Sequence, residues 1–246
     1  MALRDEIILF LNDYLQVDQF KDYGPNGLQV EGKNKVERIV TGVSASAELF
    51  TKAAAKGADM IIVHHGILWE KNSLVIKGGF RRRIELLLGD EITLLAYHLP
   101  LDKHPQIGNN ALAASALGVE ALQEFAEVGL QGKVHPIPFA EFQAKVRAYY
   151  GTEPLVFSYG PERVERIGIC SGGAPRSIVE AIDCGLDVYI TGEASEATLH
   201  LAKEGRIHFI AAGHYATEKP GIRALGDLVA KQFGVQVEFI DIPNPV

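Results

Sequence analysis

The chain carries two copies of one sequence plan. Val36–Ile39 (VERI) recurs letter for letter as Val164–Ile167, an offset of 128 positions. With the same offset, Gly57–Ile62 (GADMII) falls on Gly185–Ile190 (GLDVYI), and no gap is needed in between. An internal repeat of this length predicts that one structural unit is built twice.

Beyond these segments the offset shortens to 116 positions. Ala96–His98 (AYH) falls on Ala212–His214 (AGH), and Asp102 falls on Glu218. The first copy therefore holds about a dozen extra residues, which we place around Gly66 to Arg83.

Each copy alternates short apolar runs rich in β-branched residues with amphipathic segments. The first copy predicts strands at 39–43, 60–63 and 92–96 and helices at 47–56 and 82–88. The second predicts strands at 166–170, 188–191 and 207–211 and helices at 176–183 and 195–203. Strand, helix and strand in succession predict an α/β fold with mixed, largely parallel sheets covered by helices.

The repeat predicts two similar α/β domains, which we set at 1–125 and 126–246. The second domain begins with an expected insert at about 126–160, where a helix at 139–150 lies between strands at 133–137 and 154–158. The second copy then covers about 161–246. A helix at about 3–15 precedes Asp22–Gly27 (DYGPNG), whose Gly, Pro and Asn residues are typical of turns.

Composition and charge exclude several classes of protein. The 246 residues, 47% of them hydrophobic, can bury a core without disulfides or a structural metal. A net charge of −7 without a long basic stretch argues against nucleic-acid binding, because non-specific affinity comes from Lys and Arg on phosphates. Two cysteines outside a C-x-x-C pair, no signal peptide and no membrane-length apolar run predict an unanchored cytoplasmic protein.

Histidines and carboxylates follow three of the predicted strands. In open α/β sheets, ligands gather beyond the carboxyl ends of strands. His64 and His65 follow the strand at 60–63, His98 and Asp102 follow the strand at 92–96, and His214 and Glu218 follow the strand at 207–211. A His-His pair alone is more typical of a polar loop, but three such strand ends together favour a metal site.

The residue types narrow the choice of metal. Imidazole and carboxylate without thiolate suit Zn, Mn, Fe, Co or Ni. Five or six candidate ligands exceed the three protein ligands typical of one catalytic zinc. We therefore predict a dinuclear site with two divalent ions per chain.

Four segments together resemble the signatures of the dinuclear-metal Nif-three-like family, whose members are commonly named GTP cyclohydrolase 1 type 2 or homologs of it. They are Asn26–Val30 (NGLQV), Ile62–Gly66 (IVHHG), Ala96–Asp102 (AYHLPLD) and Gly213–Glu218 (GHYATE). The resemblance covers essentially the whole chain, and the combination is specific although each piece alone is weak.

The resemblance implies a ligand set and an assembly. The implied metal ligands are His64, His65, Asp102, His214 and Glu218, with Glu218 as the bridge. It also implies a metal cleft between two similar domains, a toroidal homohexamer, and opening of the purine ring of GTP by water. Many relatives have an acidic residue in the stretch that reads TGVSAS at 41–46, and this chain lacks it.

Two metal ions that activate water point to a hydrolase acting on a small molecule, a nucleotide or related heterocycle. His98 and Glu193 are the candidate catalytic residues, as orienting groups or proton carriers; Glu193 is the offset-128 counterpart of His65. Ordinary hydrogen-bonded polar residues explain this pair equally well. The alternative function is a non-catalytic metal-binding oligomer with a regulatory or scaffold role.

Two further features have both a structural and a functional interpretation. Cys170–Pro175 (CSGGAP) joins a strand to a helix, which indicates a tight turn more than a cradle for an oxyanion. Trp69 lies near His64 and His65 in sequence and either packs there or walls a pocket for a base.

Overall fold

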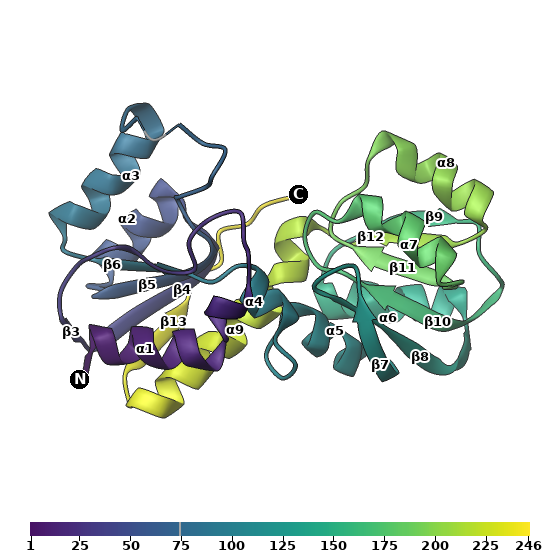
Figure 1. Ribbon diagram of the computed structural model, residues 1–246, viewed down its shortest axis with the longest axis horizontal. Coiled ribbons are helices and arrows are strands. Elements are labelled where there is room, and N and C mark those ends of the chain that lie inside the picture. The colour runs from purple at the N-terminus through teal and green to yellow at the C-terminus, as the bar shows by residue number, and fades with distance from the viewer. Residues whose placement is uncertain (74) are drawn as a thin grey trace. The chain divides into compact units, whose positions relative to one another are not determined.

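The computed structural model describes residues 1–73 and 75–246, which form two compact units (Figure 1). Unit 1 contains Met1–His104 and Gly221–Ile242, and unit 2 contains Pro105–Pro220 and Pro243–Val246. The boundary set at 125/126 falls inside unit 2, at the turn between two paired strands.

Unit 1 is built on a five-stranded sheet in the order β13-β4-β5-β6-β2. The first four strands run parallel and β2 is antiparallel at the edge. The strands are β2 (Gly27–Val30), β4 (Arg38–Ser44), β5 (Met60–His65), β6 (Thr93–Ala96) and β13 (Gln236–Phe239), with a small antiparallel pair, β1 (Ala2–Leu3) and β3 (Lys35–Val36).

The helices of unit 1 cover both faces of this sheet. In Figure 1, α2 and α3 lie on one face, and α1 lies on the other. The helices are α1 (Arg4–Tyr14), α2 (Ala47–Ala55), α3 (Gly78–Gly89) and α4 (Leu99–Lys103), with a 3₁₀ turn at Val17–Gln19. Leu49 and Phe50 of α2 pack on Ile61 and Val63 of β5, all fully buried, so this part of the chain folds around an apolar sheet face.

Unit 2 is built on a six-stranded sheet in the order β7-β8-β10-β11-β12-β9. Its strands are β7 (Glu120–Phe125), β8 (Gly129–Pro138), β9 (Leu155–Ser158), β10 (Arg163–Ile169), β11 (Val188–Thr191) and β12 (His208–Ala211). The central trio β10-β11-β12 is parallel, and β8 and β9 flank it antiparallel. Its helices are α5 (Asn109–Leu117), α6 (Phe139–Tyr150), α7 (Ile178–Asp183) and α8 (Glu196–Gly205), with a 3₁₀ turn at Pro175–Ser177.

The predicted α/β class with mixed sheets is confirmed, although three of the five strand pairings in the sheet of unit 2 are antiparallel. The predicted insert is not a module of its own. β8 pairs with β10, β9 pairs with β12, and Phe142 and Val146 of α6 lie in the main core of unit 2. The apolar face of α6 is buried against the central strands, which the sequence pattern of the insert alone does not reveal.

The last long helix belongs to both units. α9 (His214–Phe233) gives its first turns, up to Pro220, to unit 2 and the remainder to unit 1. The chain then forms β13, which pairs in parallel with β4 from Gln236 opposite Arg38 onward. Within the described residues, no helix is both long and apolar enough to cross a membrane.

Equivalent contacts hold the start of β4 in unit 1 and the middle of β10 in unit 2. The Asp59 carboxylate accepts hydrogen bonds from the backbone of Glu37 and Arg38, and the Asp187 carboxylate accepts them from Glu165 and Arg166. These contacts obey the offset of 128 positions, while the duplication itself stays a prediction.

Replacing Asp187 with Ala is expected to lower the free energy of unfolding by about 1 to 3 kcal/mol, because two charge-assisted hydrogen bonds are lost at once. Urea unfolding of Asp187→Ala and of Asp183→Ala, an unrelated carboxylate at the end of α7, measures the difference. Equal stabilities of the two variants would show that the Asp187 carboxylate does not support the strand.

Candidate metal centre

The first candidate ligands lie at the end of strand β5 in unit 1. His64 is fully buried, His65 is partly buried, and their ring centroids are 4.7 Å apart. The Nδ1 atom of His64 donates to the carbonyl oxygen of Tyr97 at 2.9 Å, and its Nε2 atom lies 3.4 Å from an oxygen of Asp102. A metal-binding histidine typically fixes one ring nitrogen on an oxygen and presents the other to the ion.

The turn after His65 is held by two residues from neighbouring strands. Ser44 Oγ, in the stretch that reads TGVSAS at 41–46, lies 3.3 Å from His65 Nδ1. Gln29 Oε1 accepts from the Ile67 amide at 2.7 Å. A Cβ on Gly66 would lie 2.2 Å from that same Gln29 oxygen, so a larger residue here would have to displace the Gln29 side chain.

His98 is oriented by a carboxylate that the sequence analysis did not select. Its Nδ1 atom lies 2.7 Å from Oδ1 of Asp22, whose side chain is 2% exposed. Asp22 also accepts from the Leu99 amide and from the Asn26 side chain, and Asn26 in turn accepts from the His98 amide. Burial alone would raise the pKa of Asp22, but the hydrogen bonds and charge of its partners, His98 first, lower it to about 2.

His98 lies against the two histidines of β5. Its ring centroid is 5.1 Å from that of His64 and 5.5 Å from that of His65. Trp69 packs edge-on against His98 at 5.2 Å and donates its Nε1 hydrogen to the Gly66 carbonyl. Trp69 therefore packs beside the histidines. Of the two interpretations of Trp69, packing and a wall of a base-binding pocket, these contacts favour packing.

Unit 2 brings the remaining candidates together at the start of α9. His214 Nε2 lies 3.1 Å from Oε1 of Glu218, one turn further along the helix, as the four-residue spacing predicts. His214 Nδ1 lies 2.5 Å from Oε1 of Glu193, in the loop after β11. Glu193, predicted as an orienting group or proton carrier, thus holds the imidazole from the side away from Glu218.

The loop at Cys170–Pro175 packs against His214 and Glu218. Its backbone amides donate hydrogen bonds to protein side chains. The amides of Ser171, Gly172 and Ala174 donate to the side chains of Asn110, Thr217 and Thr191. These three amides are therefore occupied, and the interpretation of the loop as an oxyanion cradle does not hold. Glycine at position 172 is explained by a close approach: a Cβ on Gly172 would lie 2.3 Å from Oε1 of Glu218.

The two carboxylates change the protonation of His214 in the metal-free protein. Burial favours the neutral ring, but hydrogen bonds and charge from Glu218 and Glu193 outweigh it and raise the pKa of His214 to about 9. A cation is therefore held between the two carboxylates at neutral pH. A divalent ion at Nε2 has to displace this proton.

Two pH effects follow for His214. The raised pKa contributes stability that is present in full below pH 6.5 and is lost as the pH rises to about 9. We expect the unfolding free energy of the metal-free protein to fall by about 2 kcal/mol over that range, and metal affinity to rise over it. Urea unfolding at pH 6.5 and 9 measures the change in stability, and Zn²⁺ titration at the same two pH values measures the change in affinity. The difference in stability between the two pH values should be smaller in His214→Gln. An unchanged difference in this variant would show that other groups cause it.

The donors of each unit suit a divalent ion. Four imidazoles each have Nδ1 near an oxygen atom: His64 on Tyr97, His65 on Ser44, His98 on Asp22 and His214 on Glu193. This leaves four Nε2 atoms and the carboxylates of Asp102 and Glu218 as donors, the nitrogen and oxygen set typical of Zn, Mn, Fe, Co or Ni. Asp22, Asn26 and Ser44 are the residues that the sequence analysis missed; the DYGPNG turn holds the first two.

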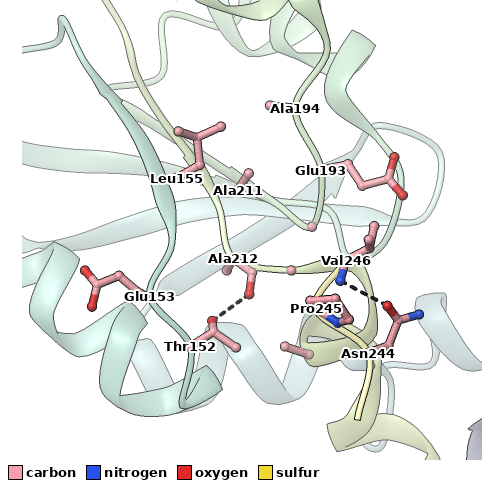
Figure 2. Close-up of a pocket in the computed structure, with 13 residues that line it drawn as sticks. Thr152, Glu153, Leu155, Glu193, Ala194, Ala211, Ala212, Asn244, Pro245 and Val246 are labelled. Atoms are coloured by element: carbon pink, nitrogen blue, oxygen red, sulfur yellow. Dashed lines mark hydrogen bonds between the residues drawn. The ribbon is translucent and has the colours of Figure 1, made fainter. Parts of the chain in front are cut away.

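A pocket of about 380 Å³ opens beside Glu193 in unit 2 (Figure 2). One wall carries the hydrogen bond from Thr152 to the Ala212 carbonyl, and Asn244 to Val246 form another wall. The Val246 oxygen accepts from the Tyr215 amide in the first turn of α9, next to His214. The described lining residues include Glu153 and Glu193 and no basic side chain.

Known proteins were compared with this chain in sequence and structure. The model of the family described as Duf34/NIF3 (NGG1p interacting factor 3) matches residues 2–245. The chain belongs to the Duf34/NIF3 family. It is 46% identical over 242 residues to a protein of Salmonella typhimurium named GTP cyclohydrolase 1 type 2 homolog, covering 98% of each chain.

Two solved structures agree with this fold over the full length of the chain. The structure of protein ybgI, described as of unknown function, is similar at a TM-score of 0.96 and 44% identity and covers 100% of both chains. TTHA1606 from Thermus thermophilus gives a TM-score of 0.93 at 34% identity, again over 100% of both chains.

Proposed function

We propose that this Duf34/NIF3 chain is a dinuclear metal-dependent hydrolase, similar in activity to GTP cyclohydrolase 1 type 2. The observation that carries the proposal is a shared arrangement of four imidazoles, each with Nδ1 within hydrogen-bond distance of an oxygen atom. In two of them, His64 and His214, Nε2 lies beside the buried carboxylates of Asp102 and Glu218. Such oriented donors are typical of metal sites that bind and polarise water.

The proposed centre uses the five ligands that the family resemblance implies. His64, His65 and Asp102 would hold one part of it, and His214 and Glu218 the other, with Glu218 as a ligand to both ions. When bound, two divalent ions lower the pKa of a water molecule and stabilise an oxyanion. Each unit on its own already places its donors within a few Å of one another.

The residues around these donors have positioning tasks. Asp22 holds His98, and Glu193 holds His214, each through Nδ1. Because both carboxylates are engaged with an imidazole, their support for catalysis comes through the orientation of the ring.

For the substrate, we propose a nucleotide or related heterocycle, with GTP as the first compound to test. The pocket beside Glu193 presents carboxylates and no basic side chain among its described lining residues, so it suits the N–H donors of a purine and not its phosphates. Phosphate groups would contact the metal ions.

We further propose that the protein is cytoplasmic and forms a toroidal homohexamer. Two cysteines outside a C-x-x-C pair and an acidic net charge of −7 support the compartment, and the resemblance to the family supports the ring. Native mass spectrometry of the purified chain tests the assembly, for which a six-fold mass is expected and a monomer would contradict it.

Elemental analysis of protein purified without chelator tests the centre itself. About two ions per chain are expected, with retention in His200→Ala, a control for a mostly exposed histidine on α8. The loaded protein is then incubated with GTP and with a panel of nucleotides and phosphoesters. Background turnover of all of them at full metal loading would refute the hydrolase and leave the alternative, a metal-binding regulatory or scaffold protein.

A further inference from the structure

We propose that unit 1 carries a separate binding site for a small organic phosphate, in the cavity between the segment after β5 and helix α3. Arg83 and Lys77 would hold the phosphate group, and Trp69 and Phe80 would contact its apolar body. The proposal goes beyond the hydrolase, because it needs neither the metal ions nor the pocket beside Glu193.

The cavity has a volume of about 240 Å³ and lies within unit 1. Ile67, which lines it, is buried and belongs to the apolar core of this unit, and Leu68 and Phe80 pack against that core. Pockets for drug-sized ligands have volumes of about 300 to 1,000 Å³. This cavity therefore suits a smaller molecule with an apolar part.

Trp69 forms a wall of the cavity, and its position is fixed by packing. Its Nε1 atom donates to the Gly66 carbonyl at 3.1 Å, and its ring lies edge-on to His98, with ring centroids 5.2 Å apart. The same ring thus contacts His98 and borders the cavity. It is the only tryptophan in the sequence, so its fluorescence reports on what occupies the cavity.

Two cations line the cavity without a carboxylate partner. Arg83 is half-buried, its guanidinium carbon lies 6.0 Å from the centre of the Phe80 ring, and its Nη1 atom donates to a backbone carbonyl at 3.2 Å. Lys77 is exposed. Among the described residues, no acidic side chain lines the cavity or pairs with either cation, whereas the neighbouring Arg81 pairs with Glu85 at 2.6 Å.

These charges favour a phosphate as the head group of the ligand. A guanidinium group has five N–H donors and binds phosphate through two parallel hydrogen bonds, and only one donor of Arg83 has a partner in the protein. A phosphate monoester carries a charge of about −1.5 to −2 at pH 7, which two cations can balance. Of the three consecutive arginines at 81–83, Arg83 alone is among the residues that line the cavity.

The fluorescence of Trp69 in the metal-free full chain tests the site. Removal of metal by a chelator keeps phosphate groups from binding at the proposed metal centre. Hexyl phosphate is expected to change the emission in a saturable way, with at least about tenfold higher affinity than inorganic phosphate, because its chain buries apolar surface. Hexanol, which has the chain without the charge, should bind at least about tenfold more weakly than hexyl phosphate.

Arg83→Met and Arg82→Met are a matched pair on one helix. Arg83→Met keeps an apolar stem at the cavity and should weaken hexyl phosphate binding by about tenfold, whereas Arg82→Met, outside the cavity lining, should leave it unchanged. Lys77→Met, at an exposed position where the fold is not at risk, should also weaken binding, by about threefold.

Three results would overturn the proposal: no saturable change with hexyl phosphate, equal affinities for hexanol and hexyl phosphate, or equal affinities of Arg83→Met and Arg82→Met for hexyl phosphate. None of them affects the hydrolase, which is judged by the ion count and by turnover of the loaded chain. Conversely, background turnover in a chain that binds hexyl phosphate through Arg83 would refute the hydrolase alone.

Discussion

Replacing Glu218 with Ala is expected to remove most of the bound metal, with a loss of affinity of more than about 100-fold. Glu218 is 2% exposed, and its Oε1 lies 3.1 Å from His214 Nε2, so the carboxylate is directed at the donor of the neighbouring imidazole. In the proposed centre this carboxylate would be a ligand to both ions. Its loss therefore affects the whole centre, whereas loss of an imidazole affects one ion.

The comparison of Glu218→Ala with His98→Ala tests the bridge directly. Elemental analysis after gel filtration should find close to no ion in Glu218→Ala and clearly more metal in His98→Ala. Glu218→Gln keeps the shape but removes the charge, and should resemble Glu218→Ala if charge is what holds the ions. Equal losses in Glu218→Ala and His98→Ala would contradict the bridging role.

The parts of the fold that follow from local pattern could be predicted from the sequence. The apolar runs that became β4, β5 and β6 are short, β-branched and followed by polar residues, and their periodicity differs from that of α2 between them. Because side chains at the ends of neighbouring parallel strands meet at one sheet edge, His64 and His98 could also be expected to lie close together.

Features that depend on contacts distant in sequence could not be predicted in the same way. Asp22 is one acidic residue in a turn-forming stretch, and nothing in its local pattern indicates a hydrogen bond to His98, 76 positions away. Likewise, β13 follows a helix near the chain end and pairs with β4 of unit 1, although its sequence lies in the second copy. Both depend on tertiary packing, which a local pattern does not encode.

The sequence pattern favoured a tight turn at 170–175, but it did not reveal why glycine is needed at position 172. A Gly-Gly pair between strand and helix suggests amides free to bind an anion, but Ser171, Gly172 and Ala174 all donate to side chains. The glycine at 172 is needed because Glu218 and His214 approach its α-carbon, and the distance of that approach is a property of α9 and not of the loop.

Gly172→Ala is expected to cost about 2 to 4 kcal/mol of stability and to weaken metal binding by at least tenfold. The backbone at Gly172 has a φ of +70°, which L-residues adopt at a cost. In addition, the new Cβ would lie 2.3 Å from Oε1 of Glu218 and 3.3 Å from Nε2 of His214. Both donors are buried or half-buried, so the contact is relieved only by moving a ligand or the loop.

Gly173→Ala is the matched control for this change. Its Cβ would meet His214 at 3.4 Å, an ordinary contact, so stability and affinity should stay near those of the unmodified protein. Urea unfolding of the metal-free proteins separates the backbone cost from the metal effect, and Zn²⁺ competition with a chelator measures the latter. If Gly172→Ala bound Zn²⁺ as tightly as Gly173→Ala, the donors at 214 and 218 would not be held in place by this loop, and the steric account of the glycine would be wrong.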